Sequence, residues 1–108
     1  MTVREFVDTS DFEILCLPSP DKTVCGVYIG DLLSWVMGKA NIGDVWITIM
    51  SNANIIAVAS LADVSCIVLS EDVSIDDEIV TLAQSKGINV LKTALSSYKA
   101  AIKTHELL

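Results

Sequence analysis

The chain has 108 residues, enough for one domain built around a single core. Its 14 Asp and Glu residues outnumber its 7 Lys and Arg residues, so the net charge of −7 argues against nucleic-acid and anionic-membrane partners. The apolar fraction of 52% and the mean hydropathy of +0.56 are high for so small a domain, and they favour an oligomer interface that would cover surplus apolar surface.

The first half of the chain alternates between helical and extended patterns. Residues 3–9 predict a short helix, and residues 12–17 predict a strand. After a loop that contains two prolines, residues 24–29 predict a second strand, apolar on both faces. Residues 31–37 predict an almost wholly apolar helix that ends at Gly38.

The second half of the chain alternates more regularly between strands and helices. Short connections of this kind predict βαβ units with right-handed crossovers and parallel strands. We therefore expect a single α/β domain over residues 1–108, a layered fold with a mainly parallel sheet flanked by helices. The expected strands are residues 45–49, 66–69 and 88–91, and the expected helices are residues 53–62, 75–86 and a last helix from about residue 95.

Residue choices also predict the ends and the faces of the last two helices. Ser74 and Asp77 have capping-box spacing for the helix at 75–86, and Gly87 is expected to end it. The expected inward face of that helix is Ile75, Ile79, Leu82 and Ala83. The last helix is expected to turn Leu95, Tyr98, Ala101, Ile102 and His105 inward, which makes the only histidine a packed structural residue.

The three cysteines lie in apolar runs, at spacings that match no metal motif. We interpret Cys16, Cys25 and Cys66 as reduced core residues and expect a cytoplasmic protein. The opening residues do not resemble a signal peptide, and no stretch reaches the roughly 18 apolar residues of a membrane span.

The sequence contains no recognisable catalytic constellation. A phosphate loop is absent, because Gly38 and Lys39 are followed by Ala40, and no nucleophile–base pair or metal-ligand set is visible. The acidic run at residues 71–78 either binds a divalent cation or complements a helix dipole, and we favour the dipole. We expect no enzyme activity, no catalytic or metal-binding residue and no cofactor.

One constellation is a candidate ligand site. In open α/β sheets, ligands bind at the carboxyl ends of the strands. Those ends carry Gly30, Asp31, Ser51, Asn52 and Asn54 here, and a helix start at the last three residues would suit a phosphate or a base. The alternative is that Ser51 or Asn52 simply caps the helix.

The helix at 31–37 is a candidate interface. It is apolar on every side, which a helix at the surface of a monomer has no reason to be. The alternative is that this helix, like the apolar segment at 55–59, is buried between the sheet and outer helices. The proposed interface residues are Leu32, Leu33, Trp35, Val36 and Met37.

The run Asp21–Ser34 resembles the signature of the DRTGG domain family, and the segments at 43–48 and 54–59 match in order and spacing. The similarity runs from about Val3 to the last helix. The chain departs from the family at its namesake motif, where Lys22 stands for the arginine, Cys25 for the threonine and Val27 for the second glycine.

The resemblance implies an α/β domain like the N-terminal domain of HPr kinase/phosphorylase. Similar domains accompany phosphotransacetylases and CBS-containing pyrophosphatases as regulatory and assembly parts. Stand-alone copies are typical of anaerobic bacteria, which implies a partner enzyme in redox or hydrogenase metabolism.

Our hypothesis from the sequence is a non-catalytic regulatory and assembly module that forms a homodimer. The alternative is a small-ligand sensor for an adenine nucleotide or another phosphorylated metabolite. The two functions are compatible at a dimer cleft.

Overall fold

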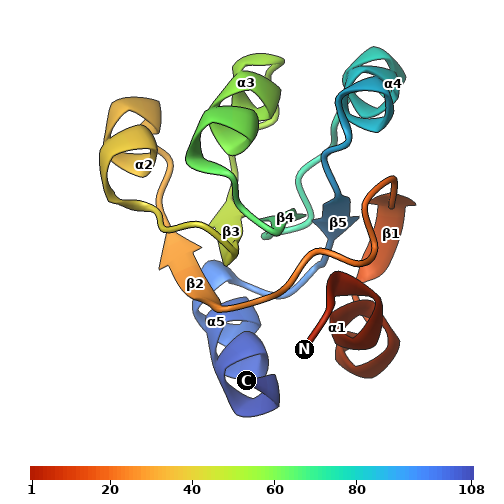
Figure 1. Cartoon of the computed structure of the whole chain (residues 1–108), viewed down its shortest axis with the longest axis vertical. Helices are drawn as coiled ribbons and strands as arrows, with labels where there is room; N and C mark the ends of the chain where they lie inside the picture. Colours follow the sequence, from red (N-terminus) through yellow and green to blue (C-terminus); the bar gives the residue numbers. More distant parts are fainter.

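The computed structural model describes all 108 residues as a three-layer α/β/α sandwich (Figure 1). The sheet has five strands in the order β1-β5-β4-β3-β2. Strands β2, β3, β4 and β5 run parallel to one another, and β1 pairs antiparallel with β5. The helices are α1 (Val3–Ser10), α2 (Leu33–Lys39), α3 (Asn54–Ala62), α4 (Asp77–Lys86) and α5 (Ser97–Leu107), and the strands are β1 (Glu13–Cys16), β2 (Gly26–Ile29), β3 (Asp44–Thr48), β4 (Cys66–Leu69) and β5 (Val90–Lys92).

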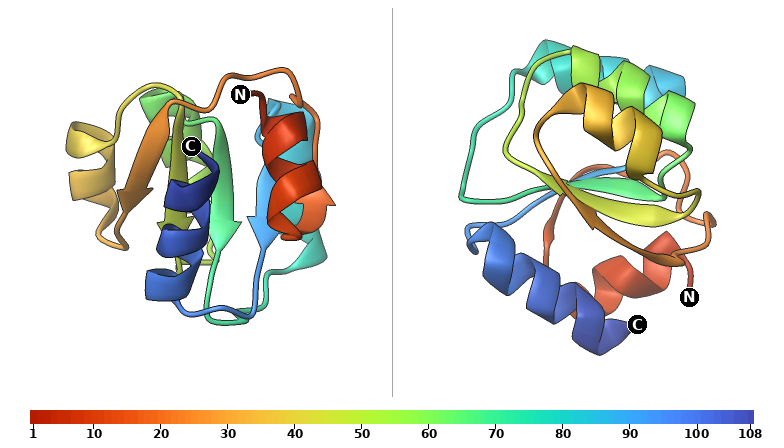
Figure 2. Two further views of the ribbon diagram at one scale, coloured as in Figure 1. Left: turned by 90° about the horizontal axis from the view of Figure 1, so that it is seen from below. Right: turned by 90° about the vertical axis from the view of Figure 1, so that its left-hand side faces the viewer.

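The helices divide between the two faces of the sheet. Helices α2, α3 and α4 cover one face, and α1 and α5 cover the other, where both termini also lie (Figures 1 and 2). The predicted layered α/β fold with a mainly parallel sheet is confirmed. None of the helices combines the length and the apolar character needed to cross a bilayer.

The central strands separate two hydrophobic clusters. All five residues of β3 and all four of β4 are buried. Because side chains alternate along a strand, Trp46 packs in the cluster beneath α2, α3 and α4, while Val45 and Ile47 pack in the cluster with α1 and α5. A strand buried on both faces is expected to be a continuous apolar run, as β4 is over Cys66–Leu69.

A buried asparagine ties three segments together at the amino end of β5. The Asn89 side chain accepts a hydrogen bond from Ser19 N at 2.8 Å and donates to Ser19 O at 2.7 Å and Ser65 O at 2.9 Å. These bonds hold the long β1–β2 connection against the start of β4. Asn89 is 1% exposed, so its polar atoms depend on these partners.

Two helix starts differ from the prediction. Helix α2 begins at Leu33 rather than at residue 31, because the Asp31 carboxylate is hydrogen-bonded to the end of β3. It runs through Gly38 to Lys39, so the expected stop at that glycine is wrong. Helix α4 begins at Asp77 without a side-chain cap, so the expected capping box is absent.

The orientation of the last helix was predicted correctly only in part. Leu95 and Ala101 pack against the core as expected, whereas Tyr98, Ile102 and His105 do not. The residues of α5 that are buried against the sheet are Ala100 and Thr104. Tyr98 is 73% exposed, Ile102 is 39% exposed, and His105 also lies at the surface. Small residues let the helix lie close to β2 and β3, and apolar residues on both sides of the helix made the periodicity ambiguous.

We predict that Asn89→Ala lowers the free energy of unfolding by about 2–4 kcal/mol, because it removes the side-chain partner of Ser19 N, of Ser19 O and of the buried Ser65 O, of which Ser19 O keeps the Lys22 amide as a second donor. Urea unfolding followed by circular dichroism measures the loss. The control is Asn41→Ala at an exposed position, which should change stability by less than about 0.5 kcal/mol. Equal stabilities of the two variants would contradict this role for Asn89.

Candidate functional site

The carboxyl edge of the sheet begins with the turn between β2 and α2. The Asp31 Oδ1 atom accepts hydrogen bonds from Thr48 Oγ1 at 2.8 Å and from Ile49 N at 3.0 Å. Thr48 Oγ1 in turn accepts from Met50 N at 3.2 Å. The carboxylate thus joins the ends of β2 and β3, and one of its oxygens already has two donors.

Gly30 is held by the same turn. Its carbonyl accepts a hydrogen bond from the indole Nε1 of Trp46 at 2.9 Å. A Cβ atom at this position would lie 2.9 Å from a ring carbon of Tyr28, closer than side-chain packing allows. Close approach of the Tyr28 ring therefore explains the glycine.

The other predicted ligand residues lie at the start of α3. The Asn52 Oδ1 atom accepts a hydrogen bond from Asn54 N at 3.0 Å, which supplies a partner for one free amide of the helix start. Asn54 is exposed, and Ser51 is half-buried. The structure thus brings Gly30 and Asp31 to the end of β3, and the β3–α3 connection leads from there to the three polar residues.

Two cavities are present, and neither is lined by the predicted ligand residues. One is an apolar groove of about 400 Å³ between α3 and α4. The other has a volume of about 170 Å³ and lies at the amino ends of β2, β3 and β4. The groove is lined by Ala53, Ile56, Ala57, Ser60, Leu61, Leu82 and Lys86, and the smaller cavity by Lys22, Thr23, Cys25, Ile42, Gly43, Asp63 and Ser65.

The smaller cavity lies at the segment that resembles the family's namesake motif. Lys22 Nζ bonds Asp63 Oδ1 at 2.9 Å and the carbonyl oxygen of Val64 at 3.1 Å, so it clamps this loop to the turn before β4. Gly43 has a φ of +84°, and a Cβ there would lie 2.7 Å from Cys25 Sγ. The sequence analysis did not predict this cavity. The segment that resembles the namesake motif, which contains Lys22 and Cys25, could have indicated its position.

The three thiols do not share one environment. Burial raises the pKa of the Cys16 thiol and raises that of Cys66 to about 12. Cys25 is exposed beside the smaller cavity, so its expected place in the core is wrong. The short strand β2 begins only at Gly26, so Cys25 lies in the loop that precedes it.

The apolar helix divides between core and surface. Leu32, Trp35 and Met37 are 61%, 57% and 49% exposed. Leu33 is half-buried, and Val36 is fully buried in the core, which corrects its assignment to an interface. The ammonium of Lys39 lies 4.4 Å from the centroid of the Trp35 ring, a cation–π contact on the exposed side of α2.

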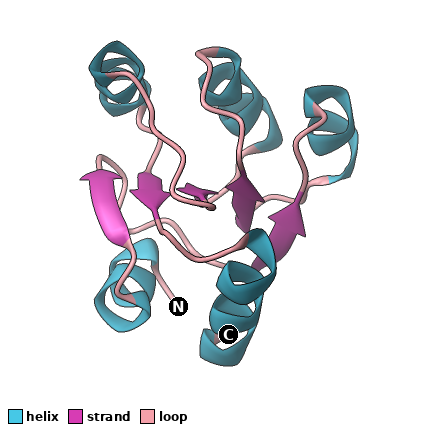
Figure 3. Cartoon of the chain, turned by 180° about the vertical axis from the view of Figure 1, so that it is seen from behind, coloured by secondary structure: helices cyan, strands magenta, loops and turns pink.

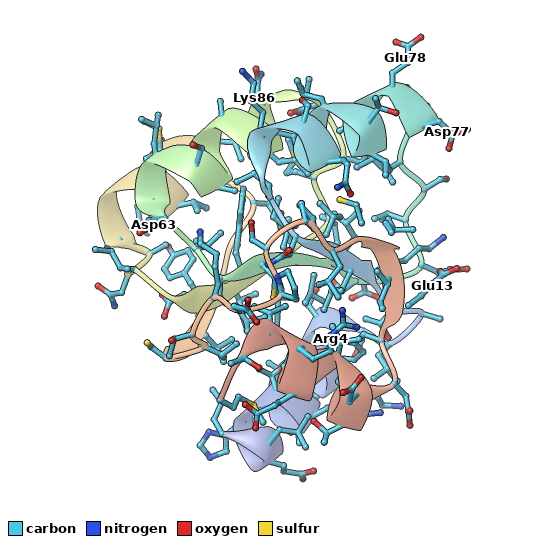
Figure 4. The ribbon with its side chains drawn as sticks, turned by 45° about the vertical axis from the view of Figure 1, so that its right-hand side comes forward. Arg4, Glu13, Asp63, Asp77, Glu78 and Lys86 are labelled. Atoms are coloured by element: carbon cyan, nitrogen blue, oxygen red, sulfur yellow. The ribbon has the colours of Figure 1, made fainter.

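The acidic residues that precede and begin α4 are largely solvated. Asp77 and Glu78 extend away from the start of the helix (Figure 4). Glu71 Oε2 accepts from Ser97 N at 3.1 Å, and Asp72 lies 3.6 Å from Lys92 Nζ. No group of three or more His, Cys, Asp and Glu side chains is placed to share a metal ion.

We predict that a thiol reagent at neutral pH modifies one cysteine of the folded chain, because Cys25 is exposed while the other two are buried. Mass spectrometry after labelling identifies the site, and Cys25→Ser should remove the rapid reaction. Labelling in urea should reach all three thiols. Rapid modification of Cys66 in the folded chain would show that its burial is incomplete.

A search of curated proteins finds no match. Among solved structures, the chain is similar to the CBS and DRTGG domains of the regulatory region of a Clostridium perfringens pyrophosphatase, complexed with its activator diadenosine tetraphosphate. The TM-score is 0.72 at 21% identity, over 95% of this chain and 45% of that one. This chain therefore spans less than half of that structure, and the likeness shows the fold.

The family model of the DRTGG domain matches residues 21–107. These residues include the namesake-motif loop, the carboxyl edge of the sheet and the helices α2 to α5. The chain belongs to the DRTGG domain family.

Proposed function

We propose that this chain is a non-catalytic regulatory and assembly module that acts as a homodimer. Family membership supports the regulatory part, because a DRTGG domain lies in the regulatory region of the similar pyrophosphatase. The observation that carries the dimer is the exposure of Trp35 and Met37 in the short helix α2 and of Leu32 just before it. Aromatic residues and Met are enriched at interfaces, and Trp is frequent among residues that dominate binding energy.

The absence of catalysis is supported by the surroundings of the histidine and of two of the three thiols. His105 lies exposed on the outer face of α5. Burial raises the pKa of the Cys16 and Cys66 thiols, which is opposite to the shift that a nucleophile needs. A partner enzyme in redox or hydrogenase metabolism is the expectation that the family resemblance adds to this proposal.

The dimer is tested by native mass spectrometry and sedimentation of the wild-type chain at tens of micromolar. We predict that Trp35→Ala weakens association by about 2 kcal/mol or more, which is about 30-fold in Kd, because the exposed indole anchors the contact. Leu32→Ala should also weaken it. The matched control is Leu61→Ala, a leucine that is 75% exposed on α3 beside the groove. A monodisperse wild-type monomer would refute the homodimer.

A second candidate function is sensing of an adenine nucleotide or another phosphorylated metabolite. The similar pyrophosphatase region was crystallised with diadenosine tetraphosphate as its activator. The proposed contacts are Gly30, Asp31, Ser51, Asn52 and Asn54, at the carboxyl edge where α/β sheets bind ligands. Amide groups at the start of α3 are the donors that would suit a phosphate, whereas the Asp31 carboxylate suits a ribose hydroxyl or a base amine.

We predict that an adenine nucleotide at 100 times its Kd adds about 2.7 kcal/mol to the stability of the folded chain. Thermal unfolding with a panel that includes AMP, ATP and diadenosine tetraphosphate measures the effect. Asn54→Ala should reduce the shift, and Asn41→Ala, at an exposed position between α2 and β3, should leave it unchanged. An unchanged melting temperature across the panel would remove nucleotide sensing and leave the homodimer untouched.

A further inference from the structure

The two edges of the sheet are built differently. At one edge, β1 carries the charged Glu13 and a register shift between Ile14 and Cys16. Bulges and charges of this kind keep an edge strand from pairing with another chain. Glu13 extends outward on the same side of the molecule as Asp77 and Glu78 (Figure 4).

The opposite edge lacks both kinds of protection. Strand β2 pairs in regular register with β3 over its four residues and has no neighbour on its other side. It contains Gly26, Val27, Tyr28 and Ile29, without a charge or a proline, and Ile29 is 49% exposed. Such a strand presents unpaired N–H and C=O groups that are ready to pair with a second strand.

Charge favours a second copy of the chain at this edge. Two copies with a net charge of −7 repel each other, so they meet at lowest cost where acidic residues are fewest. Asp31 is the only charged residue between Gly26 and Gly38, and its Oδ1 atom is hydrogen-bonded within the chain. The acidic start of α4 lies far from this edge, above β5 and β1 (Figures 1 and 3).

Helix α2, which lies beside the β2 edge, can supply interface area that the four-residue strand β2 cannot bury by itself. A stable interface buries roughly 800 Å² on each partner, more than four residues of one strand edge provide. Helix α2 covers the sheet at β2 (Figure 1). A twofold axis perpendicular to the sheet pairs β2 with its copy in antiparallel fashion and places both α2 helices on the same face. Leu32 and Trp35 are then available for contact across the axis.

We propose that β2 joins antiparallel to β2 of a second copy, so that one sheet continues through both subunits of the homodimer. This inference rests on the proposed homodimer and specifies its geometry. The partner surface is the same strand and the same helix of the second chain. Backbone hydrogen bonds then determine the register, while the exposed side chains of α2 supply apolar burial.

The matched variants are Ile29→Lys on β2 and Ile14→Lys on β1, two edge-strand isoleucines that are 49% and 43% exposed. A lysine blocks edge pairing. We predict that Ile29→Lys raises the dimer Kd by about tenfold or more, whereas Ile14→Lys leaves it unchanged. Sedimentation equilibrium measures both, and circular dichroism checks that each variant is folded.

Amide hydrogen exchange measured by NMR separates strand pairing from a side-chain contact. In the wild-type dimer, the amides of Gly26–Ile29 that do not bond β3 should exchange more slowly than in the Trp35→Ala variant under monomeric conditions. A wild-type dimer with the same exchange rates at β2 as that monomer would overturn the β2 pairing and leave the homodimer standing. A wild-type monomer would overturn both.

Discussion

The hydrogen bond from the Trp46 indole to the Gly30 carbonyl connects the core to both candidate surfaces. Trp46 is fully buried on β3, next to the edge strand β2, and packs in the cluster beneath α2, α3 and α4. The bond fixes the turn after β2, and Asp31 then bonds the end of β3. Helix α2 consequently starts at Leu33 and directs Val36 into the core, which leaves Trp35 at the surface.

The acidic start of α4 and the exposed apolar side chains of α2 lie near opposite edges of the sheet. The acidic start of α4 and Glu13 belong to the side of β1, and the exposed apolar residues of α2 belong to the side of β2 (Figures 1 and 4). Such an arrangement suits a small module that meets a copy of itself at one end and stays solvated at the other. A nucleotide at the carboxyl edge would lie next to the turn that positions α2. Nucleotide binding could therefore be coupled to dimerisation through this turn.

The loop that resembles the namesake motif is held in place by contacts within this chain. Lys22 links it to Asp63, and Asn89 holds the preceding residues through Ser19. These contacts lie at the amino ends of the parallel strands, where Lys22 and Asp63 line a cavity of about 170 Å³ beside Cys25. The candidate ligand residues lie at the other end of the strands.

The sequence by itself determined the α/β fold, the parallel sheet and the position of nearly every element, because buried parallel strands and short connections leave strong local patterns. It also marked α2 as unusual and placed Gly30 and Asp31 after β2. Only the tertiary structure decided which side of each apolar helix is covered. Val36 is buried while Trp35 is exposed, and α5 buries Ala100 rather than Tyr98. Apolar residues lie on both sides of these helices, so the choice depends on how closely each side can approach the sheet.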